Sequence, residues 1–168
     1  MKGVRQWKKR KKNEKKIAVD VVAAGLKTPT LYVLEASNKE LSALAKRFEV
    51  EKIHFLKVEL TIYPGDIVRI EGKLKALTRR ECVISLEKFD EKMKEDFEVF
   101  YADNPPAESD EIIDTIDKGR IHLGEIVAEQ YGLALNPFPK KPGVKNPFAE
   151  KGEEKQHPFA NLKKILKK

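Results

Sequence analysis

The sequence is poor in cysteine and contains no long hydrophobic run. With Cys82 as the only cysteine among 168 residues, it cannot form an intramolecular disulfide or a multi-cysteine zinc site. No stretch approaches the roughly 20 consecutive apolar residues that a transmembrane helix requires. The basic start leads into Ile17–Asp20, where a charge interrupts the apolar run that a secretory signal would need. We therefore expect one domain in a cytoplasmic protein, with no membrane partner.

Motifs that carry known chemistry are also missing. There is no phosphate-binding P-loop, no dinucleotide-binding glycine motif and no nucleophile elbow. None of the three histidines has a second ligand at metal-binding spacing, so the sequence indicates no metal and no cofactor. Arg79 and Arg80 would lower the pKa of the Cys82 thiol, but no histidine is placed locally as its base. The sequence therefore favours a binding protein over an enzyme, without a small-molecule substrate.

Positive charge gathers at both ends of the chain. The formal net charge is +7, to which residues 1–16 contribute +8 and residues 140–168 contribute +6, so residues 17–139 carry −7. Blocks of like charge resist packing, and we expect both ends to be disordered basic arms. Such arms suit a polyanion, because each phosphate that they neutralise releases a counterion. The simpler alternative is that the lysine-rich ends only maintain solubility.

The N-terminal arm combines a tryptophan with a run of cations. An indole ring can stack on a nucleobase while neighbouring cations contact phosphates. We predict RNA contacts by Trp7, Lys8, Lys9, Arg10, Lys11 and Lys12. Four cations of a predicted strand extend this surface where they share a sheet face: Lys73, Lys75, Arg79 and Arg80. Strand alternation places Arg79 with Lys73 and Lys75, and Arg80 on the opposite face.

The first part of the central domain predicts two short strands and a helix. Apolar, β-branched runs at Ile17–Ala24 and Leu31–Leu34 indicate the strands. The helix is expected at Asn38–Glu49, where apolar residues follow helical spacing. Ser37 and Glu40 have the spacing of a capping box, in which each side chain satisfies a free backbone N–H of the first turn.

Alternating apolar and polar residues then predict antiparallel strands at 52–63, 66–84 and 96–102. In the first of these strands, the apolar residues from Leu56 onward are expected to face the core. An acidic linker at 103–118, which is either a solvated surface or a competitor of RNA for the basic arms, precedes a second helix at 123–135. The expected fold is α+β: an antiparallel sheet, open or barrel-like, with two helices packed on it over residues 17–139.

The dipeptide Pro-Phe occurs three times between residue 137 and the end of the sequence. Each repeat places one large ring on an otherwise polar, proline-stiffened segment, which suits an anchor in a groove of the domain itself or of a partner. The three predicted anchors are Phe138, Phe148 and Phe159. Because Phe138 lies nearest the core, we expect it to dock on its own domain.

The segment 119–143, GRIHLGEIVAEQYGLALNPFPKKPG, resembles the YceD family of bacterial proteins. In that family an acidic linker leads to the pattern (I/L)DLGE-(I/L)-V-x-EQ-x-x-LAL-x-P-x-P, followed by a tail rich in proline and charge. The closing segment 158–168 and the cysteine-containing segment 81–87 are also similar to the family. The resemblance covers residues 17–168 and is most specific in the helix of segment 119–143.

Two features depart from the family pattern. Many members carry a Cys-x-x-Cys pair where this chain has Cys82 and Ser85, and some add cysteines where residues 139–144 have none. The resemblance therefore implies no metal role. The basic start, residues 1–16, has no counterpart in the family.

The YceD family is associated with the accumulation of 23S ribosomal RNA. The resemblance thus implies a factor for the synthesis, processing or stability of this RNA. The missing catalytic motifs and the basic arms add the expectation that the factor is non-catalytic and contacts rRNA or a pre-ribosomal particle through these arms. The alternative is a protein-interaction adaptor, in which the helix at 123–135 and the phenylalanine anchors hold a ribosomal protein or an rRNA-processing enzyme. The basic arms would then be incidental.

Overall fold

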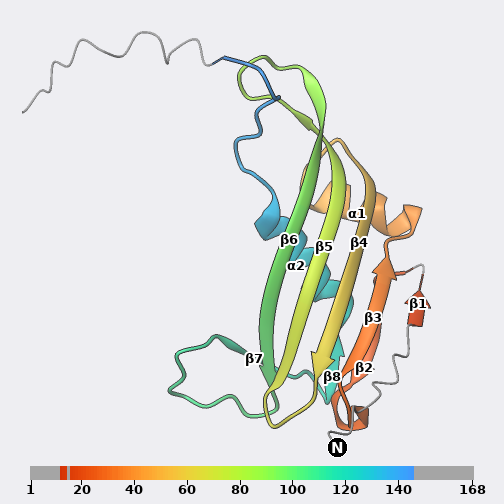
Figure 1. Cartoon of the computed structure of the whole chain (residues 1–168), viewed down its shortest axis with the longest axis vertical. Coiled ribbons are helices and arrows are strands. Elements are labelled where there is room, and N and C mark those ends of the chain that lie inside the picture. Colours follow the sequence, from red (N-terminus) through yellow and green to blue (C-terminus); the bar gives the residue numbers. More distant parts are fainter. Residues whose placement is uncertain (1–11, 15, 146–168) are drawn as a thin grey trace, which may run out of the picture.

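The computed structural model describes residues 12–14 and 16–145 (Figure 1). In chain order, its elements are β1 (Lys12–Glu14), β2 (Asp20–Val22), the short 3-10 helix η1 (Ala23–Gly25), β3 (Thr30–Glu35), α1 (Asn38–Arg47), β4 (Lys52–Tyr63), β5 (Val68–Glu81), β6 (Lys88–Ala102), β7 (Ile113–Thr115), β8 (Arg120–His122) and α2 (Leu123–Ala134). None of the helices among these residues has the length and apolar character needed to cross a membrane.

The main sheet has the strand order β1-β3-β4-β5-β6-β7. Its central strands β3 to β6 pair antiparallel, whereas the short strands β1 and β7 join the two sides in parallel. β2 and β8 form a separate antiparallel pair. The prediction of an α+β fold is confirmed, and the sheet is open: its strand order has two ends and does not close into a barrel.

One face of the main sheet carries the core. In β4 the residues Leu56, Val58, Leu60 and Ile62 are fully buried, as their alternation predicted. They pair with the buried residues of β5, which end at Thr78. Both α1 and α2 lie on this face, behind the strands in Figure 1. Within residues 12–14 and 16–145, no helix therefore covers the opposite face of the sheet, which we call the open or uncovered face.

Helix α1 begins at the predicted capping box. The Ser37 hydroxyl accepts a hydrogen bond from the Glu40 N–H, and the Glu40 carboxylate accepts one from the Ser37 N–H at 2.8 Å. The other carboxylate oxygen of Glu40 accepts hydrogen bonds from the N–H groups of Ile17 and Ala18, at 3.0 and 2.9 Å. Glu40 therefore fixes both the helix start and the entry of the chain into the domain.

Helix α2 is a core element. It buries Leu123, Ile126, Val127, Ala128 and Tyr131. The Tyr131 ring meets the Phe48 ring edge-on, with 5.5 Å between the centroids. This contact joins α2 to the end of α1.

Several element bounds differ from the expectation. The strand expected at 17–24 is reduced to β2 and η1, and the strand expected at 66–84 ends at Glu81. The third long strand begins at Lys88 rather than at residue 96, and β7 and β8 lie within or just after the expected linker. β1 lies within the N-terminal segment that we expected to be disordered. That expectation is wrong for Lys12–Glu14, because backbone pairing with the edge of β3 needs no apolar pattern.

Candidate nucleic-acid interface

The uncovered face of the sheet carries a row of three lysines. Lys57 of β4 pairs with Lys75 of β5, which pairs with Lys94 of β6. Their side chains are exposed, and none forms an ion pair within residues 16–145. Like charges directly opposite each other on a sheet destabilise it. The fold thus holds three mutually repelling cations side by side, with Glu35 of β3 at the end of the row.

An apolar pair of residues lies next to this row. Phe55 of β4 pairs with Leu77 of β5, which pairs with Lys92 of β6. The strand pairing shifts between Ile53 and Phe55, at a bulge, and the Phe55 side chain is 42% exposed. An aromatic ring therefore stands on the open face, one row of residues from the lysines.

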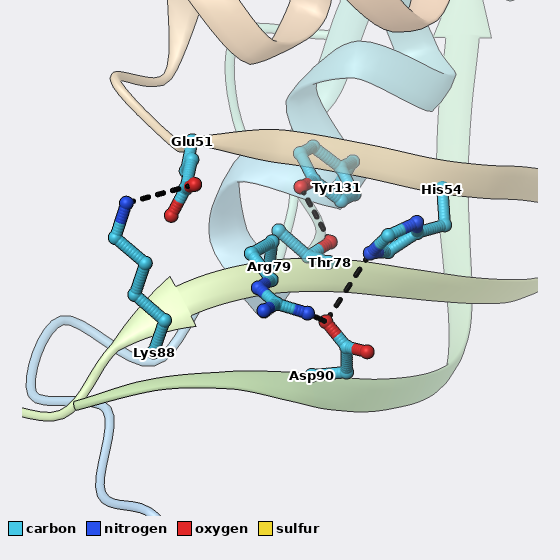
Figure 2. A network of polar contacts seen from close by, with 7 residues as sticks. All are labelled: Glu51, His54, Thr78, Arg79, Lys88, Asp90 and Tyr131. Carbon is cyan, nitrogen blue, oxygen red and sulfur yellow. Dashed lines mark hydrogen bonds and ion pairs between the residues drawn. The ribbon is translucent and has the colours of Figure 1, made fainter.

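A neutralised cluster follows in the next row (Figure 2). The carboxylate of Asp90 accepts a hydrogen bond from Arg79 at 3.1 Å and lies 3.2 Å from the His54 ring. Partial burial raises the pKa of Asp90, but the hydrogen bonds from Arg79 and His54 outweigh this effect and hold it below its ordinary value. Because Arg79 already forms an ion pair with Asp90, it is less available to a phosphate than the lysines are.

The predicted cations of β5 have different surroundings. Lys73, Lys75 and Arg79 share the open face, as strand alternation indicated. Lys73 pairs across the strands with Glu59 and with Asp96, so its positive charge lies between two carboxylates.

Arg80 does not belong to this surface. Its guanidinium donates a hydrogen bond to the Asn136 carbonyl oxygen at 2.9 Å and lies 3.6 Å from Glu91, and its side chain is 12% exposed. We therefore correct the prediction of an RNA contact at Arg80. Its charge is used inside the protein, where it holds the chain that leaves α2.

Sequence reasoning missed Lys57, Lys92, Lys94 and Phe55. For Lys57 a signal was available: strands that turn back at Pro64–Gly65 bring Lys57 opposite Lys75. For Lys92 and Lys94 there was none, since the first half of β6 was not predicted as a strand.

Residues Trp7, Lys8, Lys9, Arg10 and Lys11 lie outside the described residues, as do Phe148 and Phe159. Lys12 opens β1, where its backbone stands opposite Tyr32 of β3. The described end of the N-terminal arm is thus attached to one side of the sheet.

Cys82 lies in the turn between β5 and β6, not on a strand as expected. Its side chain is fully buried. Hydrogen bonds from the Ser85 hydroxyl and from the N–H groups of Lys141 and Ser85 lower the pKa of the Cys82 thiol to about 7. The predicted cause, two neighbouring arginines, is wrong: the donors come from the turn and from the chain after α2.

The residues after α2 pack against this turn. The Val83 N–H donates to the Pro139 carbonyl oxygen at 3.0 Å, and the Lys141 ammonium lies 2.9 Å from the Glu87 carboxylate. Pro139 is buried, whereas the Phe138 side chain is 68% exposed. The expectation that Phe138 docks on its own domain is therefore wrong, and Pro139 takes that place.

The helix that was expected to hold a protein partner cannot do so with its apolar face, because that face of α2 is buried in the core. Among residues 12–14 and 16–145, no group of three or more His, Cys, Asp or Glu side chains is placed to hold a metal ion.

Comparison with models of protein families, with curated proteins and with solved structures found no match. The resemblance to the YceD family therefore stays a prediction that rests on the quoted segments.

Proposed function

We propose that the protein is a non-catalytic RNA-binding factor of the cytoplasm that supports the accumulation of 23S ribosomal RNA during large-subunit biogenesis. The observation that carries the proposal is the row Lys57, Lys75 and Lys94 on the uncovered face of the sheet. The resemblance to the YceD family supplies the identity of the RNA.

The physical argument is that this row costs the protein stability and suits an anionic ligand. Lysines placed directly opposite each other repel, and the described structure offers them no ion-pair partner. RNA phosphates would relieve this repulsion and release counterions. The cations of residues 1–12 would add further contacts without sequence specificity.

The test is ultraviolet crosslinking in cells, followed by sequencing of the attached RNA. The variant K57Q/K75Q/K94Q removes the row, and K27Q/K39Q/K46Q removes the same charge from exposed lysines elsewhere. We expect crosslinks concentrated in 23S rRNA or its precursor, reduced by the first variant and retained by the second. Crosslinks at background level for the unmutated protein, with 23S rRNA still depleted when the gene is removed, would exclude direct binding.

The second candidate is an adaptor that holds a ribosomal protein or a processing enzyme. It is favoured by the apolar side chains at the β5–β6 turn, where Val83 is 47% exposed and Leu86 is 70% exposed beside the segment that carries Phe138. Leu86 has a φ of 56°, a strained conformation for a leucine, and such strain is often kept for function.

The adaptor function predicts a separate phenotype. Replacing Phe138 with serine would then deplete 23S rRNA while leaving the RNA crosslinks of the protein unchanged. The RNA-binding function predicts that this variant keeps both its RNA crosslinks and its 23S rRNA, since Phe138 lies in the segment beside the β5–β6 turn and not in the lysine row.

A further inference from the structure

We infer that the interface takes single-stranded RNA, with an unstacked base on the Phe55 ring and the backbone phosphates along Lys57, Lys75 and Lys94. This inference rests on the proposed function and deepens it by naming the class of RNA. It follows from the juxtaposition of a ring and a lysine row on one open face.

The Phe55 ring distinguishes single strands from duplexes. In an A-form duplex the base faces are stacked on one another, so proteins read the duplex through its shape, its phosphates and its 2′-hydroxyls. An aromatic side chain on a sheet can stack on an RNA base only where that base is unstacked from its neighbours. Such stacking accepts any of the four bases. Phe55 is 42% exposed on the face that neither α1 nor α2 covers, with the apolar Leu77 directly beside it.

The spacing brings the two features within reach of one strand of RNA. Phe55 and Lys57 are two residues apart on β4 and therefore point to the same face, about 7 Å apart along the strand. The lysines then follow across β4, β5 and β6 at the separation of paired strands, about 5 Å. Lys92, opposite Leu77, adds a cation beside the apolar pair of Phe55 and Leu77.

Carboxylates on the rest of the open face limit the area that an RNA can contact. The row beyond the lysines holds Glu59 and Asp96 around Lys73, and the following row holds Glu71 and Glu98, which both pair with Arg69 at 3.0 and 3.1 Å. The broad phosphate surface of a duplex would extend over these carboxylates. A single strand that crosses β4 to β6 along the lysine row avoids them.

The experiment compares two labelled RNAs on the full chain by fluorescence anisotropy: an oligouridine of about 12 nucleotides, within the usual site size of single-strand binders, and a duplex of equal length. We expect the oligouridine to bind at least about tenfold more tightly, a difference of the order of one base–aromatic stack. The variant F55L should lose most of this preference. The matched control F138L replaces another exposed phenylalanine and should retain it.

The lysine row is tested through salt. For K57Q/K75Q/K94Q, the slope of log affinity against log salt concentration should fall by about 2, at about 0.7 for each phosphate contact of a single strand. The charge-matched K27Q/K39Q/K46Q should change the slope less. In the unmutated protein, 4-thiouridine in the oligouridine should crosslink to the peptide that contains Phe55, which reports on the site without any substitution.

The outcomes separate the two proposals. Equal or tighter binding of the duplex, or equal behaviour of F55L and F138L, would overturn the single-strand inference and leave RNA binding standing. Failure of the unmutated protein to bind either RNA would overturn both. Urea unfolding of each variant verifies that a lost affinity is not a lost fold.

Discussion

The phenolic oxygen of Tyr131 lies 2.8 Å from the hydroxyl oxygen of Thr78, and both side chains are fully buried (Figure 2). This hydrogen bond joins α2 to the inner face of β5, the central one of the three strands that carry the lysine row. Burial raises the pKa of Tyr131, so its phenol stays protonated and can take part in the bond as a donor. Thr78 has one further polar neighbour, the Met93 sulfur at 3.9 Å.

Replacing Thr78 with valine should destabilise the protein by about 1–3 kcal/mol, because the buried phenol loses its partner and keeps the cost of leaving water. Y131F should cost less, since the small Thr78 hydroxyl keeps the Met93 contact. The double variant should be more stable than the sum of the two losses predicts, because it leaves neither group unpaired. Urea unfolding of all four proteins measures this coupling, and strictly additive losses would show that the bond contributes nothing.

The Glu40 carboxylate should make the protein sensitive to acid. Burial raises the pKa of Glu40, but hydrogen bonds from the Ser37 hydroxyl and from the N–H groups of Ser37, Ala18 and Ile17 outweigh it, so the pKa is lowered. A lowered carboxyl pKa contributes stability that is present above the unfolded value, about 4.3, and is lost as the pH falls through the folded value.

At neutral pH, E40Q should therefore cost about 1.5–3 kcal/mol, the range for hydrogen bonds to a charged group. The difference between E40Q and the unmutated protein should shrink as the pH falls below about 4. The control is E108Q, at an exposed residue of the loop between β6 and β7, which should be nearly neutral. Urea unfolding at several pH values measures both, and a pH-independent loss in E40Q would contradict the assignment.

Local patterns were enough to predict much of the fold. The strand at 52–63 and the capping box at Ser37 were predicted at the observed residues. A strand with one buried face shows it by alternation, and a cap requires particular residues at a fixed spacing. Most of β6 could not be predicted, because Glu91 and Glu95 occupy positions on its inner face and break the alternation.

The candidate site was predicted only in part, because it is a property of strand pairing. Lys75 was found on its own strand, but its row exists only because the register places Lys57 and Lys94 on either side. β1 and β7 were missed for a related reason. Each has three residues and pairs in parallel with one strand, so backbone pairing rather than a side-chain pattern defines it.

His122 should give a second, opposite dependence on pH. Its Nδ1 lies 2.8 Å from Asp20 and its Nε2 lies 3.7 Å from Asp117. The hydrogen bond with Asp20 raises the pKa of His122 most, against a lowering by partial burial, and Asp117 raises it further. A raised histidine pKa contributes stability that is complete below the unfolded value, about 6.5, and is lost as the pH rises through the folded value.

The difference in stability between the unmutated protein and H122Q should therefore shrink as the pH rises above about 6.5 and through the raised pKa of the folded protein. It should be small and fall with added salt, since the three side chains are between 42% and 65% exposed. An NMR titration of His122 measures the pKa, and urea unfolding measures the stability. A difference that grows toward high pH would contradict the role of the two carboxylates.

The docking of the chain after α2 should be measurable through the reactivity of Cys82. The thiol is buried, and its pKa of about 7 depends in part on the N–H of Lys141, whose ammonium is paired with Glu87. At neutral pH a large fraction of this cysteine is thiolate, the reactive form, so access rather than ionisation limits its reaction. In K141E two carboxylates face each other, and the segment should open more often, so the rate of modification by a thiol reagent should rise several-fold.

K140E changes the same charge one residue earlier, at an exposed lysine with no ion pair in the described part of the chain, and should react at nearly the unmutated rate. Equal rates in the two variants would mean that the pair of Lys141 and Glu87 does not hold this segment over Cys82.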